Sequence, residues 1–285
     1  VGPTEDQVTT TARRLVFVTA LVAFIAASGL GQEALASQEG EGGEAGQHLK
    51  FSHPLVSNTP EPENYVRFSY EYLNETSHGE EPGAHRHRLW VGAEYAPIRS
   101  FSVELFVPYT FLNPDDHSST SRVDNLEFTA KYASFAFAEQ GLMLGGGLAL
   151  DLPTGNEDKG IGSSHTWVIE PFLDFGYKLD RFELIGFANF GFPVNEQDED
   201  EADLELSWNL SFLYIITERF HYMLEFDGEH LFGGHDDFNQ VNISPGIKYQ
   251  VLKHQRLYLG ASVQLPLTPD REFYVAPRFS VFYHF

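Results

Sequence analysis

The sequence predicts an all-β fold, a transmembrane antiparallel up-and-down β-barrel of about twelve strands. Two observations support this prediction. From residue 65 to Phe285, segments of about ten residues alternate apolar and polar side chains, and turn residues separate them. The connections between segments are alternately short and long. Membrane barrels have this pattern because they place tight turns at one end and longer loops at the other.

Each expected strand is recognised by apolar residues that share one parity, and therefore one face of a pleated strand. Segment 182–192 is also expected to be a strand, although its two faces are similar. The others, with their apolar face, are 66–72 (Val66, Phe68, Tyr70), 88–95 (Leu89, Val91, Tyr95), 101–109 (Phe101, Val103, Val107), 125–132 (Leu126, Phe128, Tyr132), 142–152 (Leu142, Leu144, Leu150), 167–177 (Trp167, Ile169, Phe175), 204–214 (Leu204, Leu206, Trp208), 222–227 (Tyr222, Leu224, Phe226), 241–249 (Val241, Ile243, Tyr249), 257–265 (Leu257, Leu259, Val263) and 273–285 (Phe273, Phe279, Val281).

An even number of strands places both ends of the barrel domain on the same side of the membrane. A soluble β-sandwich would also show strands of period two. It would not explain the alternating loop lengths and the apolar outer face together. Closure follows from the solvent, because backbone N–H and C=O groups in hydrocarbon have no partner other than a neighbouring strand.

Composition excludes several other classes of protein. The formal net charge of -23 argues against a nucleic-acid partner, which requires a basic surface. A mean hydropathy of -0.25 argues against a bundle of membrane-spanning helices. The chain has no cysteine, so neither a disulfide framework nor a thiolate metal site is possible.

The chain divides into three regions. Residues 1–36 are expected to be a cleaved signal peptide, with Arg13 and Arg14 before an apolar run and Ala34-Leu35-Ala36 as the cleavage site. A single membrane anchor is the alternative interpretation of that run. Residues 37–64, rich in Gly, Glu and Pro, are expected to form a flexible or plug-like periplasmic segment. Residues 65–285 are expected to form the barrel, in the outer membrane of a Gram-negative bacterium.

Parity also predicts which side chains line the lumen. The predicted lumen-lining residues are Arg67, Glu71, Arg88, Trp90, Glu94, Glu104, Phe106, Glu127, Lys131, Glu170, Asp174, Glu225, Lys248 and Arg278. The charged members either set solute selectivity in an open pore or form a salt-bridge network that fills a narrow barrel. The aromatic members either favour an apolar solute or are ordinary interior packing.

No catalytic residue, metal ligand set or cofactor site is predicted. Ser163, Ser164 and His165 lie together in a loop, but catalysis requires a nucleophile, a base and an orienting group in mutual reach. Outward strand faces are almost wholly apolar, which disfavours the lipid hydrolases that use a barrel surface.

The final strand carries a pattern of its own. Phe279, Val281, Tyr283 and Phe285 alternate up to the last residue, and this resembles the signal by which outer-membrane barrels are recognised by their assembly machinery. Asp151-Leu152-Pro153-Thr154-Gly155, followed by 159–162 (Lys-Gly-Ile-Gly), is similar to a strand-end motif of the phenol-degradation MetA-like family of outer-membrane transporters. His53-Pro54-Leu55-Val56 resembles the lead-in of the same family.

That resemblance implies uptake of small solutes, aromatic or apolar compounds among them, with no catalytic residues to transfer. The expected function is therefore passive transport through an outer-membrane channel. The expected partners are outer-membrane lipid, lipopolysaccharide, the barrel assembly machinery and a small-molecule solute. A structural or adhesion barrel with partner-binding loops is the second hypothesis, and a barrel lipid hydrolase is the third.

Overall fold

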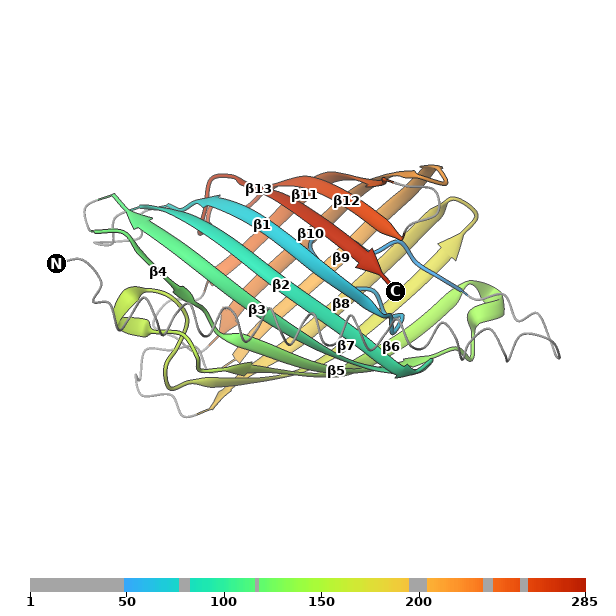
Figure 1. Ribbon diagram of the computed structural model, residues 1–285, viewed down its shortest axis with the longest axis horizontal. Coiled ribbons are helices and arrows are strands. Elements are labelled where there is room, and N and C mark those ends of the chain that lie inside the picture. Colours follow the sequence, from blue (N-terminus) through green and yellow to red (C-terminus); the bar gives the residue numbers. More distant parts are fainter. Residues whose placement is uncertain (1–48, 77–82, 116–117, 195–203, 233–237, 252–255) are drawn as a thin grey trace.

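A computed structural model describes residues 49–76, 83–115, 118–194, 204–232, 238–251 and 256–285. The predicted signal peptide and the first part of the segment after it lie outside these residues. The described chain is built almost wholly of strands that wrap around one lumen (Figure 1). Within it, no helix is both long and apolar enough to cross a membrane.

The strands follow the predicted segments closely. They are β1 (Tyr65–Asn74), β2 (Ala84–Ile98), β3 (Phe101–Pro114), β4 (Thr120–Val123), β5 (Leu126–Ser134), β6 (Leu142–Leu152), β7 (Trp167–Leu179), β8 (Phe182–Val194), β9 (Leu204–Thr217), β10 (Phe220–Phe232), β11 (Phe238–Gln250), β12 (Leu257–Pro266) and β13 (Ala276–His284). The last strand begins at Ala276 and not at Phe273, which makes only an isolated bridge to Glu75.

Apart from β4 and β5, which both pair with β3, each strand pairs with its neighbours along the chain, and every pairing is antiparallel. The barrel closes where β1 meets β13, in register from Tyr65–His284 to Glu71–Arg278 (Figure 1). Just beyond that ladder, the N–H of Phe285 donates to the carbonyl oxygen of Asn64 at 3.0 Å. The prediction of a closed antiparallel barrel is therefore confirmed.

The barrel has twelve positions, although thirteen strands are described. β4 pairs with residues 109–112 of β3, toward the loop end, and β5 pairs with residues 101–106 of the same strand. Together β4 and β5 occupy one position in the wall, and Asp124 and Asn125 interrupt it. The predicted number of twelve is confirmed.

The two faces of the wall differ as the alternation predicted. On β13, Phe279 is 63% exposed on the outer face, whereas Phe282 is fully buried on the inner face. Large apolar side chains with exposed surface occur on nearly all strands. A surface of this kind is stable in hydrocarbon, because lipid removes the cost of exposing apolar groups to water.

The two ends of the barrel differ in their connections. At the turn end, residues 99–100, 180–181 and 218–219 connect strands tightly, and Phe285 lies at the same end. Gly141 is also there with φ +77°, and a Cβ on it would lie 2.4 Å from the carbonyl oxygen of Lys178. At the loop end, the connections are longer, for example 153–166 and 267–275.

Candidate functional site

The lumen contains the chain that precedes the first strand. We call residues 49–64 the lumen segment. We expected residues 37–64 to be flexible or plug-like in the periplasm. The described part of that stretch runs inside the barrel and contacts inward side chains of the wall. His53, Leu55 and Thr59 are each less than 2% exposed. A buried peptide must satisfy its backbone polar groups, and here the inward charges of the wall bond to them.

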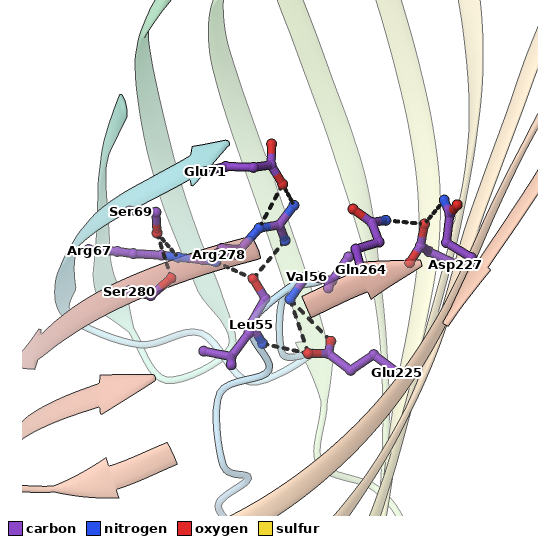
Figure 2. Close-up of polar contacts among 11 residues, drawn as sticks. Leu55, Val56, Arg67, Ser69, Glu71, Glu225, Asp227, Gln264, Arg278 and Ser280 are labelled. Carbon is purple, nitrogen blue, oxygen red and sulfur yellow. Dashed lines mark hydrogen bonds and ion pairs between the residues drawn. The ribbon is translucent and has the colours of Figure 1, made fainter. Parts of the chain in front are cut away.

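The middle of the lumen segment is held by side chains of three strands (Figure 2). Arg278 on β13 donates to the carbonyl oxygen of Leu55 at 2.9 Å, and Arg67 on β1 donates to the same oxygen. Glu225 on β10 accepts from the N–H of Leu55 at 2.9 Å and from that of Val56 at 3.1 Å. Hydrogen bonds to charged groups stabilise by roughly 1.5–3 kcal/mol each, so these contacts fix the segment firmly.

Lysines and carboxylates hold the rest of the segment in the same manner. Lys131 donates to the carbonyl oxygens of Thr59 and Glu61 at 2.9 and 3.2 Å. Lys248 donates to the carbonyl oxygen of His53 at 3.1 Å. Glu183 accepts from the N–H of Ser52 at 2.7 Å. Most of these partners are main-chain groups, so the wall recognises the peptide backbone of the segment.

Two apolar side chains complete the anchoring. Phe51 and Leu55 join a buried cluster with inward apolar residues of the wall, among them Met143, Ile185 and Leu213. The wall has a glycine at each point where the Phe51 and Leu55 side chains contact it. A Cβ on Gly176 would lie 2.6 Å from the Phe51 ring, and one on Gly260 would lie 2.2 Å from a Leu55 methyl. Burying a leucine contributes roughly 2 kcal/mol.

Two carboxyl groups of the segment carry shifted pKa values. Burial raises the pKa of Glu61 to about 7, although Lys50 and Lys131 oppose the shift. Burial also raises the pKa of Glu63 to about 8, and Glu61 adds to the effect. Both groups therefore bind a proton more readily in the lumen than in water.

The segment divides the lumen into two cavities of about 600 Å³ each. The turn-end cavity is lined by Lys50, His53, Glu61, Glu63, Lys248 and Phe285 among others. The loop-end cavity is lined by charged and aromatic residues of most strands, together with Val56, Ser57 and Asn58 of the lumen segment. A solute crossing the barrel would meet the segment between the two.

The predicted lumen residues all lie on the inner side of the wall. The residues around the loop-end cavity are Arg67, Glu71, Arg88, Trp90, Glu104, Phe106, Glu127, Lys131, Glu170, Asp174 and Arg278. Lys248 lines the turn-end cavity. Glu94 bonds to Lys131 and accepts from the N–H of Glu63, and Glu225 binds the segment at Leu55.

The structure brings some of these residues together and leaves others apart. Arg278 pairs with Glu71, and Lys131 pairs with Glu94 at 3.0 Å. Glu127 and Glu170 have neutral hydrogen-bond partners, Thr129 and Asn189. Sequence reasoning assigned all of these charges to solute or to one another, and it missed the backbone of the lumen segment as their partner.

One signal could have indicated an occupied lumen. Met143, Ile185, Leu213 and Met223 are fully or almost fully buried at inward positions near the turn end. Apolar side chains in a water-filled pore would be costly, so their inward parity predicts an apolar partner inside the barrel.

The loop at 153–166 folds against the break in the wall. The side-chain oxygen of Asn125 accepts from the N–H groups of Gly155 and Ser163, at 3.2 and 2.9 Å. Ile161 from this loop is fully buried against Ala84 and Leu112. The loop therefore covers part of the mouth at the loop end.

The serines and histidine of this loop do not form a catalytic relay. Ser164 Oγ and Glu157 Oε2 both approach Nδ1 of His165, at 2.9 and 3.4 Å. A serine–histidine–acid relay requires its serine and its acid on opposite ring nitrogens. The cluster instead orders the loop, and the Ser163 hydroxyl lowers the pKa of Glu157 to about 2.

The residues of the predicted assembly signal lie on the outer face of the last strand or at its end, where lipid and assembly machinery could reach them. Phe279, Val281 and Tyr283 are exposed on the outer face, and Phe285 is at the turn end. Their recognition by assembly machinery stays a prediction.

One known family and several solved barrels resemble this chain. The model of a family described as "Putative MetA-pathway of phenol degradation" matches residues 86–274. No curated protein matches the sequence. Among solved structures, an outer membrane channel of Pseudomonas putida F1 is similar, with a TM-score of 0.61, 13% identity, and coverage of 86% of this chain and 100% of that one.

Two further structures share the barrel. The NanC porin has a TM-score of 0.51 at 9% identity, covering 78% of this chain and 98% of that one. The translocator domain of the autotransporter NalP from Neisseria meningitidis has a TM-score of 0.50 at 10% identity, covering 94% and 98%. At these identities the similarity establishes the fold, which is that of outer-membrane barrels.

Proposed function

The chain belongs to the family of the MetA pathway of phenol degradation, and from that premise we propose that it is a passive channel for small solutes in the outer membrane. The main support is the division of its lumen. Two cavities open toward opposite ends of a closed barrel, and the lumen segment lies between them together with the apolar wall side chains that pack against it. We orient the loop end to the outside and the turn end to the periplasm, as in other membrane barrels.

The segment is held by contacts that can break and re-form. Its main-chain groups form hydrogen bonds with Arg67, Arg278, Glu225, Lys131 and Lys248, and its one covalent link to the wall is the peptide bond to Tyr65. A solute from outside enters the loop-end cavity, and it passes to the turn-end cavity when the segment shifts. Breaking one of these bonds removes only a fraction of the free energy of docking, so partial release is an accessible motion.

The solutes we propose are small and aromatic or apolar. Trp90, Phe106, Phe172 and Phe187 line the loop-end cavity and offer ring faces to a bound molecule. The description of the family points to aromatic compounds of the phenol type. Access from the outside and release to the periplasm then require no energy source.

Conductance in planar bilayers tests the proposal. We compare the chain that starts at Ser37 with a variant lacking residues 37–58, and a variant lacking only 37–47 is the matched control. The full chain and the control should give small channels, and deletion of 37–58 should raise the conductance several-fold. Absence of single-channel steps from all three proteins would refute transport and favour a structural or adhesion barrel.

Solute preference is measured by liposome swelling. Phenyl β-glucoside and methyl β-glucoside are uncharged and differ in the aromatic ring. The phenyl compound should enter faster than its larger size alone would allow. Trp90→Ala should remove that advantage, whereas Tyr222→Ala on the outer surface should not.

A further inference from the structure

The loop-end cavity has an excess of acidic side chains, and the lumen segment engages most of the cations that would offset it. Among the described residues that line it, carboxylates outnumber cations by ten to four; these are Glu71, Glu104, Asp124, Glu127, Asp151, Glu170, Asp174, Asp227, Glu229 and Glu272 against Arg67, Arg88, Lys131 and Arg278. Three of the cations are already engaged. Arg67, Arg278 and Lys131 donate to carbonyl oxygens of the segment, and the latter two also pair with acids.

The imbalance is concentrated on one part of the wall. Glu127 on β5 lies opposite Asp151 on β6, and Glu170 is on the adjacent strand β7. Within the described part of the chain, neither lysine nor arginine forms an ion pair with any of the three. The charged groups that act most strongly on Asp151 and Glu170 are other carboxylates, Glu205 among them. Among the described residues, these acids therefore have no ion-pairing lysine or arginine.

An aromatic pair lies beside the acids. Phe172 is between Glu170 and Asp174 on the inner face of β7, and its ring centroid is 5.3 Å from that of Phe187 on β8. Gly147 is opposite Phe172, and a Cβ there would lie 2.6 Å from the ring. Small residues on β6 thus give the ring its place in the wall. A ring face next to carboxylates attracts a cation, which interacts with both.

Two buried acceptor atoms lack a donor in the same region. Oδ1 of Asp174 and Oδ1 of Asn189 are buried and have no hydrogen-bond partner among the described residues. Their residues are only 6% and 8% exposed, and both line the loop-end cavity. The amide nitrogen of Asn189 is used, because it donates to Glu170 at 2.7 Å. Unpaired buried acceptors are costly, and a donor from a ligand would satisfy them.

Lys131 does not supply the missing hydrogen-bond donor to Asp174. Its ammonium acts on Asp174 electrostatically, but its hydrogen bonds go to Glu94, Thr59 and Glu61. Arg88, the remaining lining cation, acts on Glu229. The described cations that line the cavity thus form no ion pair with Asp151, Glu170 or Asp174, and all three acids line it.

We propose that Asp151, Glu170, Phe172, Asp174, Phe187 and Asn189 form a subsite for the cationic nitrogen of an organic solute, such as a protonated or quaternary aromatic amine. This inference rests on the proposed channel function and narrows its solute class. The carboxylates neutralise the charge and the two rings contact the apolar body. Where the nitrogen is protonated and not quaternary, its N–H groups donate to the acceptors. The subsite binds solute on the outer side of the lumen segment, before passage.

Calorimetric titration of the detergent-solubilised chain tests the subsite without requiring transport. The probes are phenyltrimethylammonium, benzenesulfonate and phenol, which share a ring and differ in charge. The cation should bind at least tenfold more tightly than the other two. The Asp151→Asn/Glu170→Gln double variant should lose tenfold or more of that affinity, and Phe187→Leu should lose about threefold.

Asp158→Asn/Asp270→Asn is the matched control, because it removes two exposed carboxylates of the loop end and should leave binding unchanged. Heat-modifiable migration on gels verifies that every variant is folded. Equal binding of the three probes, or unchanged cation binding by the double variant, would overturn the subsite. Bilayer recordings separate the two proposals: cation binding without channel steps refutes transport alone, and steps without cation binding refute the subsite alone.

Discussion

Arg278 on the last strand donates to the carbonyl oxygen of Leu55, and so the end of the barrel holds the chain that precedes its beginning. The same guanidinium pairs with Glu71 on β1, the strand with which β13 closes the wall. Barrel closure and docking of the lumen segment therefore share one residue. A substitution that disturbs the pairing of β1 with β13 would therefore also weaken docking of the lumen segment.

Loss of the carboxylate at position 225 should release the lumen segment. In Glu225→Gln, the bonds to the N–H groups of Leu55 and Val56 lose their ionic character, which weakens docking by about 2 kcal/mol. Hydrogen exchange of residues 50–58 should speed up roughly 30-fold, with larger channel conductance. Glu229→Gln, which lines the cavity without bonding to the segment, is the control. Unchanged exchange would show that Glu225 does not anchor it.

Docking of the segment should depend on pH. Glu61 and Glu63 have pKa values of about 7 and 8 when docked, against 4.5 in water. Because the docked state binds protons more tightly, their contribution favours docking fully below about pH 4.5 and is lost as pH rises through 7 to 8. Labelling of a cysteine placed at Ser57 should therefore be faster at pH 9 than at pH 6.

The Glu61→Gln/Glu63→Gln variant supplies the control for that measurement. Amides do not titrate, so labelling should vary with pH only as the intrinsic reactivity of a thiol does. If the wild-type chain followed that same curve, the two carboxyl groups would have no part in docking.

Asn125 should determine the order of the 153–166 loop. Asn125→Ala removes two hydrogen bonds, to Gly155 and Ser163, each worth about 1 kcal/mol. Amide exchange at 154–164 should accelerate, while exchange in β6 and β7 stays the same. Ser121→Ala, on the short strand beside the break, should leave the loop as it is. If the amides at 154–164 exchanged as slowly in Asn125→Ala as in the wild type, burial of Ile161 alone would account for the order of the loop.

The last residues should control assembly. Removing Phe285 deletes the end of the predicted assembly signal and the hydrogen bond to Asn64. The fraction of heat-modifiable barrel in isolated membranes should fall several-fold. Phe137→Ala, which removes an exposed aromatic side chain at the turn end, should assemble normally. Normal assembly without Phe285 would contradict the resemblance of the last strand to such signals.

The wall of this barrel could be predicted from the sequence, because each strand has a lipid side and a lumen side. Phe279 and Arg278 are neighbours in the chain with opposite surroundings, and that contrast repeats along β13. The same parity placed Glu94, Glu225 and Lys248 inside. The short strand β4, before the break at Asp124 and Asn125, was not predicted, because Thr120–Val123 lacks the apolar alternation of the other strands.

The lumen segment was harder to predict for a physical reason. Its contacts with the wall are mostly made by backbone groups, which every residue type has, and so they leave little pattern in the sequence. Leu55 and Phe51 are its main apolar anchors. The matching observation is on the wall, where Gly176 and Gly260 leave space for them.

A barrel that grips peptide groups places few demands on residue identity in the stretch it holds. Thr59 and Glu61 offer Lys131 carbonyl oxygens that any amino acid would supply equally well. Substitution at positions held only through their main chain can therefore leave the path intact, provided that the length of the segment, its two apolar anchors and the buried His53 persist. Homologues with unlike leader regions could share one internal route, and permeability could diversify there without altering the surrounding sheet.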